Sequence, residues 1–96
     1  MRPSEALDKN RAAIRRVVES HRARNARVFG SVLHGTDTSD SDLDILIDPT
    51  PETTLFDICA ICHELGTLLG VTVDVRTAGD LSRRFREEVV AEASPV

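Results

Sequence analysis

The sequence predicts a single α/β domain over residues 1–96, in which helices cover a small sheet of three main strands. Short apolar runs rich in β-branched residues predict strands at 43–48 and 71–77, and a third at 27–29. Apolar residues recur at helical spacing before, between and after these runs. A chain of 96 residues has room for one such domain, which would bury about 60% of its unfolded surface.

The first half of the chain predicts a helix, a strand and a loop. Ser4 is expected to cap a helix that runs to about Arg24, with Glu5 in its first turn. Its apolar face would contain Leu7, Ile14, Val17, Val18 and His21. Gly30 ends the strand 27–29, and the polar stretch 36–41 forms a loop, with room for one helical turn, that leads to Asp42.

The second half predicts a buried helix, a strand and a final helix. Pro49 and Pro51 end the strand 43–48, and Thr53 or Thr54 caps a helix that stops at Gly70. This helix is expected to be the most buried one, through an apolar stripe of Leu55, Ile58, Cys59, Cys62, Leu65 and Leu69. Asp80 is expected to cap the last helix, with Leu81, Phe85 and Val89 facing inward. Residues 94–96 should either add a short edge strand or fray.

Three carboxylates occupy positions in strands where an apolar or neutral residue would be ordinary. Asp42 and Asp44 are two residues apart, so a strand places both on one face. Asp74 lies on the polar face of 71–77, and a strand–helix–strand connection usually makes the two strands neighbours. Like charges held together resist joint ionisation unless a cation lies between them, so the pattern favours a metal site.

At this point the chain resembles a known family. Phe29-Gly30-Ser31, ten intervening residues, Asp42-Leu43-Asp44 and then Asp74 are similar to the signature of the DNA polymerase beta-type nucleotidyltransferase superfamily, and the small size matches its minimal nucleotidyltransferase (MNT) branch. The resemblance implies a mixed sheet and two Mg²⁺ ions held by the three aspartates. It also implies ATP as substrate, with Gly30, Ser31, His34 and Ser41 as the nucleotide-binding residues.

The resemblance also implies an activity and a partner. Members of this branch are frequently antitoxins that transfer AMP to a tyrosine of a HEPN-type toxin, so we expect an adenylyltransferase in which Asp74 orients or deprotonates the acceptor hydroxyl. The chain contains no Tyr, so a tyrosine acceptor would belong to another molecule. A non-catalytic antitoxin of the same fold is the alternative. Nucleotide transfer to a small molecule or a tRNA end is less favoured, because such enzymes usually carry a further domain.

Several residues have a second interpretation. The branch often has Arg where this chain has His34, which is either a weaker phosphate contact or a solvated loop histidine. Gly30-Ser31 alone would predict only a turn. Cys59 and Cys62 have redox spacing but lie inside a helical apolar stripe, which favours core packing. Arg76 is either an ion-pair partner or a triphosphate contact.

Composition narrows the expected ligands and compartment. The net charge is −4 and the chain has no Trp or Tyr, so we expect no direct binding to polymeric nucleic acid; the arginine clusters are interpreted as solvated helix faces. No apolar run approaches the roughly 20 residues of a membrane span. The N-terminal sequence has no apolar leader, so we expect a cytoplasmic protein with reduced cysteines.

Overall fold

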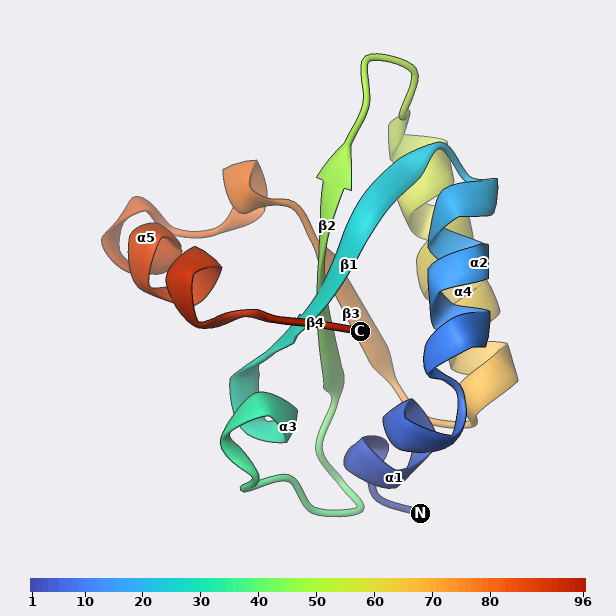
Figure 1. Ribbon diagram of the computed structural model, residues 1–96, viewed down its shortest axis with the longest axis vertical. Coiled ribbons are helices and arrows are strands. Elements are labelled where there is room, and N and C mark those ends of the chain that lie inside the picture. The colour runs from blue at the N-terminus through green and yellow to red at the C-terminus, as the bar shows by residue number, and fades with distance from the viewer.

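A computed structural model describes residues 1–96 and shows a four-stranded mixed sheet with helices (Figure 1). The elements are, in chain order, α1 (Pro3–Lys9), α2 (Arg11–Ser20), β1 (Ala23–Phe29), α3 (Gly30–His34), β2 (Leu43–Pro49), α4 (Leu55–Leu69), β3 (Val73–Arg76), the 3₁₀ turn η1 (Ala78–Asp80), α5 (Arg83–Glu92) and β4 (Ser94–Pro95). The predicted fold class is confirmed, with one short strand more than the three main strands.

The sheet has the order β3-β2-β1-β4. β1 runs antiparallel to β2 and to the two-residue β4, whereas β2 and β3 are parallel neighbours joined through α4. The predicted adjacency of the strands that carry Asp44 and Asp74 is therefore confirmed. Residues 94–95 form the edge strand that the sequence allowed, and Val96 beyond them is buried.

β1 begins four residues earlier than predicted, at Ala23. Its register with β2 shifts between Arg24 and Arg27, and Asn25 between them has a left-handed backbone with φ of 55°. Such a bulge breaks the alternation of side chains, which explains why polar residues hid this half of the strand in the sequence.

The helices α2 and α4 lie side by side and cover one face of the sheet (Figure 1). The core between them and the sheet is aliphatic, and its fully buried members include Ile14, Leu43, Ile45, Ile47, Ile61 and Leu65. Thr54 caps α4 by accepting the N–H of Asp57 at 3.2 Å, and Gly70 ends it with φ of 68°. Both predicted ends of this helix are therefore confirmed.

The predicted apolar stripe of α4 was partly wrong. Leu55 is 74% exposed and Cys59 is also exposed, whereas Ile61, which the stripe omitted, is fully buried. The helix carries apolar residues on more than one face, so periodicity alone does not decide which face packs on the sheet.

The N-terminal helix is two helices, which corrects the prediction of one. Asn10 interrupts the helix between α1 and α2, where its φ is −133°. Its side-chain amide donates to the carbonyl of Ala6 at 2.9 Å. Ser4 lies inside α1, and Arg2 at the N-cap position offers no side-chain cap. Asn favours local bonds to the backbone, so it interrupts a helix that the apolar pattern continues through.

The C-terminal helix also differs from its prediction. Asp80 forms a capping box with Thr77 around η1, and Ser82 caps α5 instead. No residue of α5 is buried, and Phe85 is 52% exposed. In Figure 1, α5 lies on the opposite side of the sheet from α2 and α4. None of the helices has the length and apolar character of a membrane span.

Candidate active site

The end of β1 and the beginnings of β2 and β3 bring three of the predicted site residues together. Phe29 is paired with Asp44 across β1 and β2, so Gly30 directly after it lies beside that carboxylate. Asp44 is paired in turn with Asp74 across the parallel β2 and β3. Neighbouring strands are about 4.8 Å apart, and paired residues project to the same face. Asp44 and Asp74 therefore form one row across β2 and β3, and Gly30, directly after β1, continues it as the first residue of α3.

Gly30 is required at its position by both space and conformation. Its φ is 72°, in the left-handed region that residues with a side chain rarely adopt. A β-carbon built at this position would overlap the Oδ2 atom of Asp44. The turn after β1 thus brings a bare backbone directly against the Asp44 carboxylate.

The Asp44 carboxylate is the most perturbed acid of the row. Burial, followed by the negative charges of Asp74 and Asp42, raises the pKa of Asp44 to about 6 from its ordinary 3.8, and Arg76 opposes this only in part. Asp42, just before β2, is exposed but close enough to contribute to the shift. The end of the sheet therefore concentrates negative charge that the protein itself does not neutralise.

Asp74 has a partner on its own strand. The Nε atom of Arg76 donates to both carboxylate oxygens of Asp74, at 3.1 and 3.2 Å. As the side chains stand, no group of three or more His, Cys, Asp or Glu residues is arranged to hold a metal ion. The chemistry of the donors nevertheless fits Mg²⁺, which prefers carboxylate oxygens, and a divalent cation would relieve the repulsion at Asp44.

The other predicted nucleotide-binding residues have partners of their own. Ser31 lies in the first turn of α3, a five-residue helix that begins at Gly30, earlier than the loop in which a turn was expected. His34 is exposed and lies 3.3 Å from Glu92 of α5. The Ser41 hydroxyl accepts the N–H of Thr38 at 2.9 Å and so closes the loop before Asp42.

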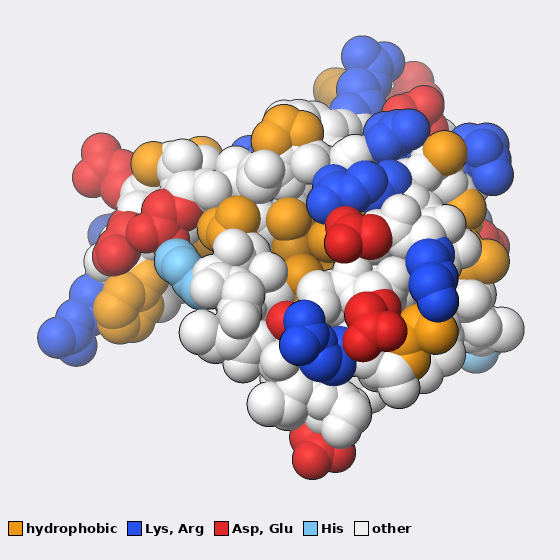
Figure 2. All heavy atoms as spheres, turned by 60° about the horizontal axis from the view of Figure 1, so that its bottom comes forward, with side chains coloured by type: hydrophobic (Ala, Val, Ile, Leu, Met, Phe, Trp, Pro, Cys, Tyr) orange, Lys and Arg blue, Asp and Glu red, His pale blue; other side chains and the backbone are white.

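Sequence reasoning placed Asp37 in the polar loop 36–41 and assigned it no role. Its side chain is completely buried, and its Oδ2 atom accepts the N–H of Ser4 from α1 at 3.0 Å. Figure 2 shows the face that includes this end of the molecule, where acidic and basic side chains are interspersed rather than gathered by sign. An aspartate in a polar loop gives no sequence signal of such burial.

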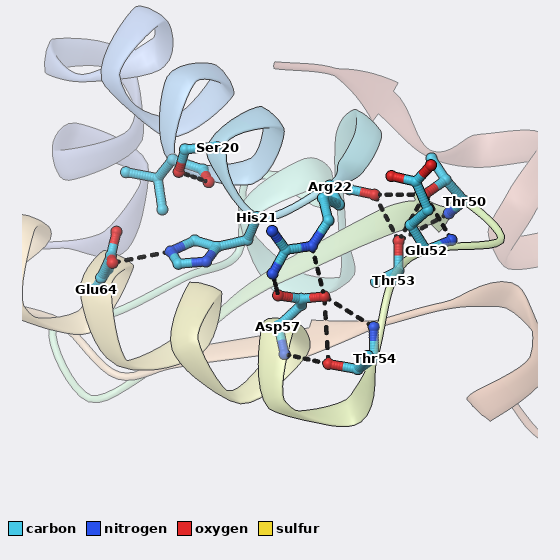
Figure 3. Close-up of polar contacts among 10 residues, drawn as sticks. Ser20, His21, Arg22, Thr50, Glu52, Thr53, Thr54, Asp57 and Glu64 are labelled. Carbon is cyan, nitrogen blue, oxygen red and sulfur yellow. Dashed lines mark hydrogen bonds and ion pairs between the residues drawn. The ribbon is translucent and has the colours of Figure 1, made fainter.

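A second missed pair lies at the far end of the sheet (Figure 3). Arg22 has φ of 64° and donates to both oxygens of the buried Asp57, at 3.3 and 2.5 Å. The hydroxyls of Thr50 and Thr53 donate to the carbonyl of Arg22 at 2.9 and 2.5 Å. This network fastens the turn before β1 to the start of α4, and it contains none of the predicted site residues.

The cysteines do not form a disulfide. Cys62 packs against the core, where its thiol donates to the carbonyl of Val73 at 3.0 Å. Burial is the main cause that raises the pKa of Cys62, so this thiol is poorly reactive. The packing interpretation holds for Cys62, while Cys59 is exposed.

Comparisons with known proteins identify the family of this chain. Residues 11–96 match the nucleotidyltransferase domain family. The chain is 29% identical over 80 residues to the "Putative protein adenylyltransferase MJ0435" of Methanocaldococcus jannaschii, covering 83% of this chain and 86% of that protein. It is 40% identical to a solved "putative minimal nucleotidyltransferase", with a TM-score of 0.86 over 97% of this chain and 95% of the other.

More distant structures share the fold. A toxin–antitoxin structure with AMP-PNP has a TM-score of 0.70 at 18% identity, over 97% of this chain and 71% of that one. A structure of the toxin–antitoxin pair MntA–HpeT has a TM-score of 0.73 at 16% identity, over 90% and 70% of the two chains. With the match over 11–96 and the 40% identical structure, the chain belongs to the nucleotidyltransferase family, as a minimal nucleotidyltransferase.

Proposed function

We propose that this nucleotidyltransferase transfers AMP from ATP to a tyrosine hydroxyl on a HEPN-type toxin and thereby acts as its antitoxin. The observation that carries the proposal is the row of Asp44 and Asp74 across β2 and β3, continued by Gly30 directly after β1, with uncompensated charge at Asp44. The relative named for protein adenylyltransfer and the toxin–antitoxin neighbours support the substrate and partner classes.

The residues of the row have distinct roles in this proposal. Asp42, Asp44 and Asp74 would hold two Mg²⁺ ions, which neutralise charge on the attacking and leaving oxygens in such reactions. The backbone of Gly30 and the hydroxyl and N–H of Ser31, at the start of α3, would bind phosphate oxygens beside the metal ions. Ser41 and His34 lie at the two ends of the loop between α3 and β2, and they would contribute to nucleotide binding from there.

Asp74 is the residue best placed to act on the acceptor. It lies on the edge strand β3, whereas Asp44 lies one strand further inside. A carboxylate at the edge can reach a hydroxyl that a partner protein presents, orient it toward the α-phosphorus and accept its proton. In this proposal Arg76 releases Asp74 when ATP binds, because the triphosphate offers the guanidinium a competing anion.

The experiment is intact mass spectrometry of a HEPN-type protein from the reading frame next to the gene for this chain, after incubation with the chain, Mg²⁺ and ATP. The expected result is a gain of one or more AMP units with the native chain and none with an Asp42→Asn variant. Peptide mapping then identifies the acceptor. A modified Ser or Thr would correct the acceptor class, and absence of any gain, with an active toxin preparation that binds the chain, would refute adenylyl transfer.

A second candidate function is neutralisation without catalysis. It is favoured by the pairing of Asp74 with Arg76 and of His34 with Glu92, which leaves no ready-made group of three metal ligands. In that case the toxin would be inhibited equally by the native chain and by the Asp42→Asn variant, with no dependence on ATP. Toxin activity measured in the same incubations therefore separates the two functions.

A further inference from the structure

We propose that Asp37 is a positioning residue of the site: its buried carboxylate caps α1 and thereby fixes the loop that leads to Asp42. This inference rests on the proposed nucleotide site. It goes beyond it by assigning a role to a residue outside the nucleotidyltransferase signature, and by giving α1 a part in building the site.

No neighbouring side chain caps the N-terminus of α1. Arg2 occupies the N-cap position with no side-chain bond to the helix, and Pro3 at the first helical position has no N–H. The next N–H, that of Ser4, is satisfied by Oδ2 of Asp37, 33 residues further along the chain. A carboxylate at a helix N-terminus is also favoured by the helix dipole. Asp37 therefore does for α1 what a local Ser or Asp usually does.

The loop 36–41 is largely isolated from the rest of the fold. Between Gly35 and Asp42, Asp37 is the only buried residue. The remaining hydrogen bonds of the segment stay within it or join it to the preceding α3, such as those from Thr38 to Ser41 and from Thr36 to Ser31. The bond to Ser4 is thus the tie between this loop and a separate part of the fold, until Leu43 enters the sheet.

The helix α1 is itself packed on the core. α1 presents Pro3, Ala6 and Leu7 to the core, where each is buried. A loop tied to α1 is consequently tied to the core, whereas the exposed Asp42 makes no side-chain hydrogen bond or ion pair that could hold it. The position of Asp42 beside Asp44 then depends on the two ends of its loop and on Asp37.

The surroundings of Asp37 favour its charged form. The N–H of Ser4, as the largest influence, holds the pKa of Asp37 below its usual value, helped by Arg2 at 3.9 Å. Its Oδ1 atom is buried and has no hydrogen-bond partner. A residue buried at this cost is retained for a definite geometry rather than for solubility.

The test combines hydrogen exchange with ligand binding in four proteins: the native chain, Asp37→Ala, Asp37→Asn and the control Asp40→Ala. Asp40 lies in the same loop, has the same charge and is exposed. In Asp37→Ala, amide exchange should rise about fivefold or more in both 3–9 and 36–43, since one cap is lost. The helices α2 and α4 should be unchanged, and Asp40→Ala should match the native chain.

Binding of Mn²⁺ with ATP, followed by electron paramagnetic resonance, reports on the site without requiring turnover. Asp37→Ala should weaken it about tenfold, as expected for loss of a residue that supports metal ligands. Asp37→Asn keeps an oxygen that can accept the N–H of Ser4, so it should weaken binding by no more than about threefold. If Asp37→Ala does not fold, Asp37→Asn decides: it should bind Mn²⁺ and ATP more weakly than both the native chain and Asp40→Ala, and binding equal to theirs would overturn the proposal.

Two outcomes would overturn the proposal. One is faster exchange confined to 3–9, which would make Asp37 a cap with no influence on the loop. The other is native-like binding of Mn²⁺ and ATP by a folded Asp37→Ala, which would make the loop tie irrelevant to the site. If the native chain itself bound neither ligand, the proposed function would fail, and the exchange data would still decide whether α1 and the loop are tied.

Discussion

Two aspartates on one strand have opposite environments. Asp48, near the end of β2, lies against Arg27 and accepts the side-chain amide of Asn25 at 2.9 Å. Asp44, four residues earlier, faces Asp74 and Asp42, and its pKa is raised to about 6. The difference teaches that β2 neutralises the acid at one end, Asp48, with partners from β1 and leaves the acid at the other end, Asp44, without an ion-pair partner where a ligand is expected.

The nearby Asp57 shows the same rule at the far end. Its hydrogen bond from Arg22 is the largest influence that lowers its pKa, and Thr54 adds to it. Asp48 and Asp57 therefore both accept hydrogen bonds from side chains of the chain itself, and Figure 3 shows those of Asp57.

The largest expected effect is on activity. Asp44→Asn should lower AMP transfer by more than about 100-fold, because even residues that only support metal ligands cost 10–100-fold. The variant should be as stable as the native chain or more so at pH 7.5, since it removes repulsion at a half-buried site. Asp48→Asn is the matched control, with activity per folded molecule kept and stability reduced. Transfer assays and thermal unfolding measure both; equal loss of activity in the two variants would erase the contrast.

The pH dependence should come next in size. Protons compete with Mg²⁺ for Asp44, so the apparent affinity for Mg²⁺ should fall about tenfold per pH unit below pH 6. Without metal, the raised pKa means that the folded chain holds a proton the unfolded chain has released, so the contribution of Asp44 to stability declines as pH rises from about 4 to 6. Calorimetric titration across pH 5–8 checks the first statement, and a flat affinity would contradict it.

Stability should fall when the far end loses its cation. Arg22→Ala leaves the buried Asp57 without its main donor and should lower the melting temperature by roughly 10 °C, a large effect for a domain of this size. Arg24→Ala, at an exposed arginine two residues away, should change it by no more than about 2 °C. Scanning calorimetry compares them. Binding of Mn²⁺ and ATP by the folded proteins should be equal, since this end contains no site residue.

The smallest expected effect concerns the cap of α4. Thr54→Ala removes the oxygen that accepts the N–H of Asp57 and should lower the free energy of unfolding by about 1 kcal/mol. Thr67→Ala, exposed within the same helix, is the control and should be neutral or slightly stabilising. Urea unfolding monitored by circular dichroism measures the difference, and identical midpoints for the two variants would show that the capping box carries little energy.

Local signals in the sequence were sufficient for much of the fold. Thr54 and Gly70 marked both ends of α4, and the carboxylates at 44 and 74 marked neighbouring strands, because capping and alternation act over a few residues. The broken first helix was missed, since the apolar pattern continues across Asn10. The wrong face of α4 was assigned to the core, because the exposed Leu55 and Cys59 follow helical spacing as well as the buried Ile61 does.

The site was predictable in composition but not in its supports. Asp44 and Asp74 stand out because carboxylates are unusual inside apolar strands, and Gly30 because it ends a strand shortly before them. The contacts of Asp37 with Ser4 and of His34 with Glu92 join segments far apart in sequence. Such contacts depend on how loops settle on a finished core, and a short polar loop has the same composition whether its aspartate is buried or solvated.

The lack of any buried residue in α5 has a consequence for proteolysis. Local opening of a helix is easiest where it buries least, and three arginines, Arg83, Arg84 and Arg86, lie in its first turns. Trypsin should therefore cut here before it cuts the arginines of α2, whose helix packs on the sheet. The short β4 beyond α5 pairs with β1, and Val96 after it is buried. The C-terminal fragment should therefore stay bound to the rest of the protein after cleavage, and the two pieces should elute together from a sizing column.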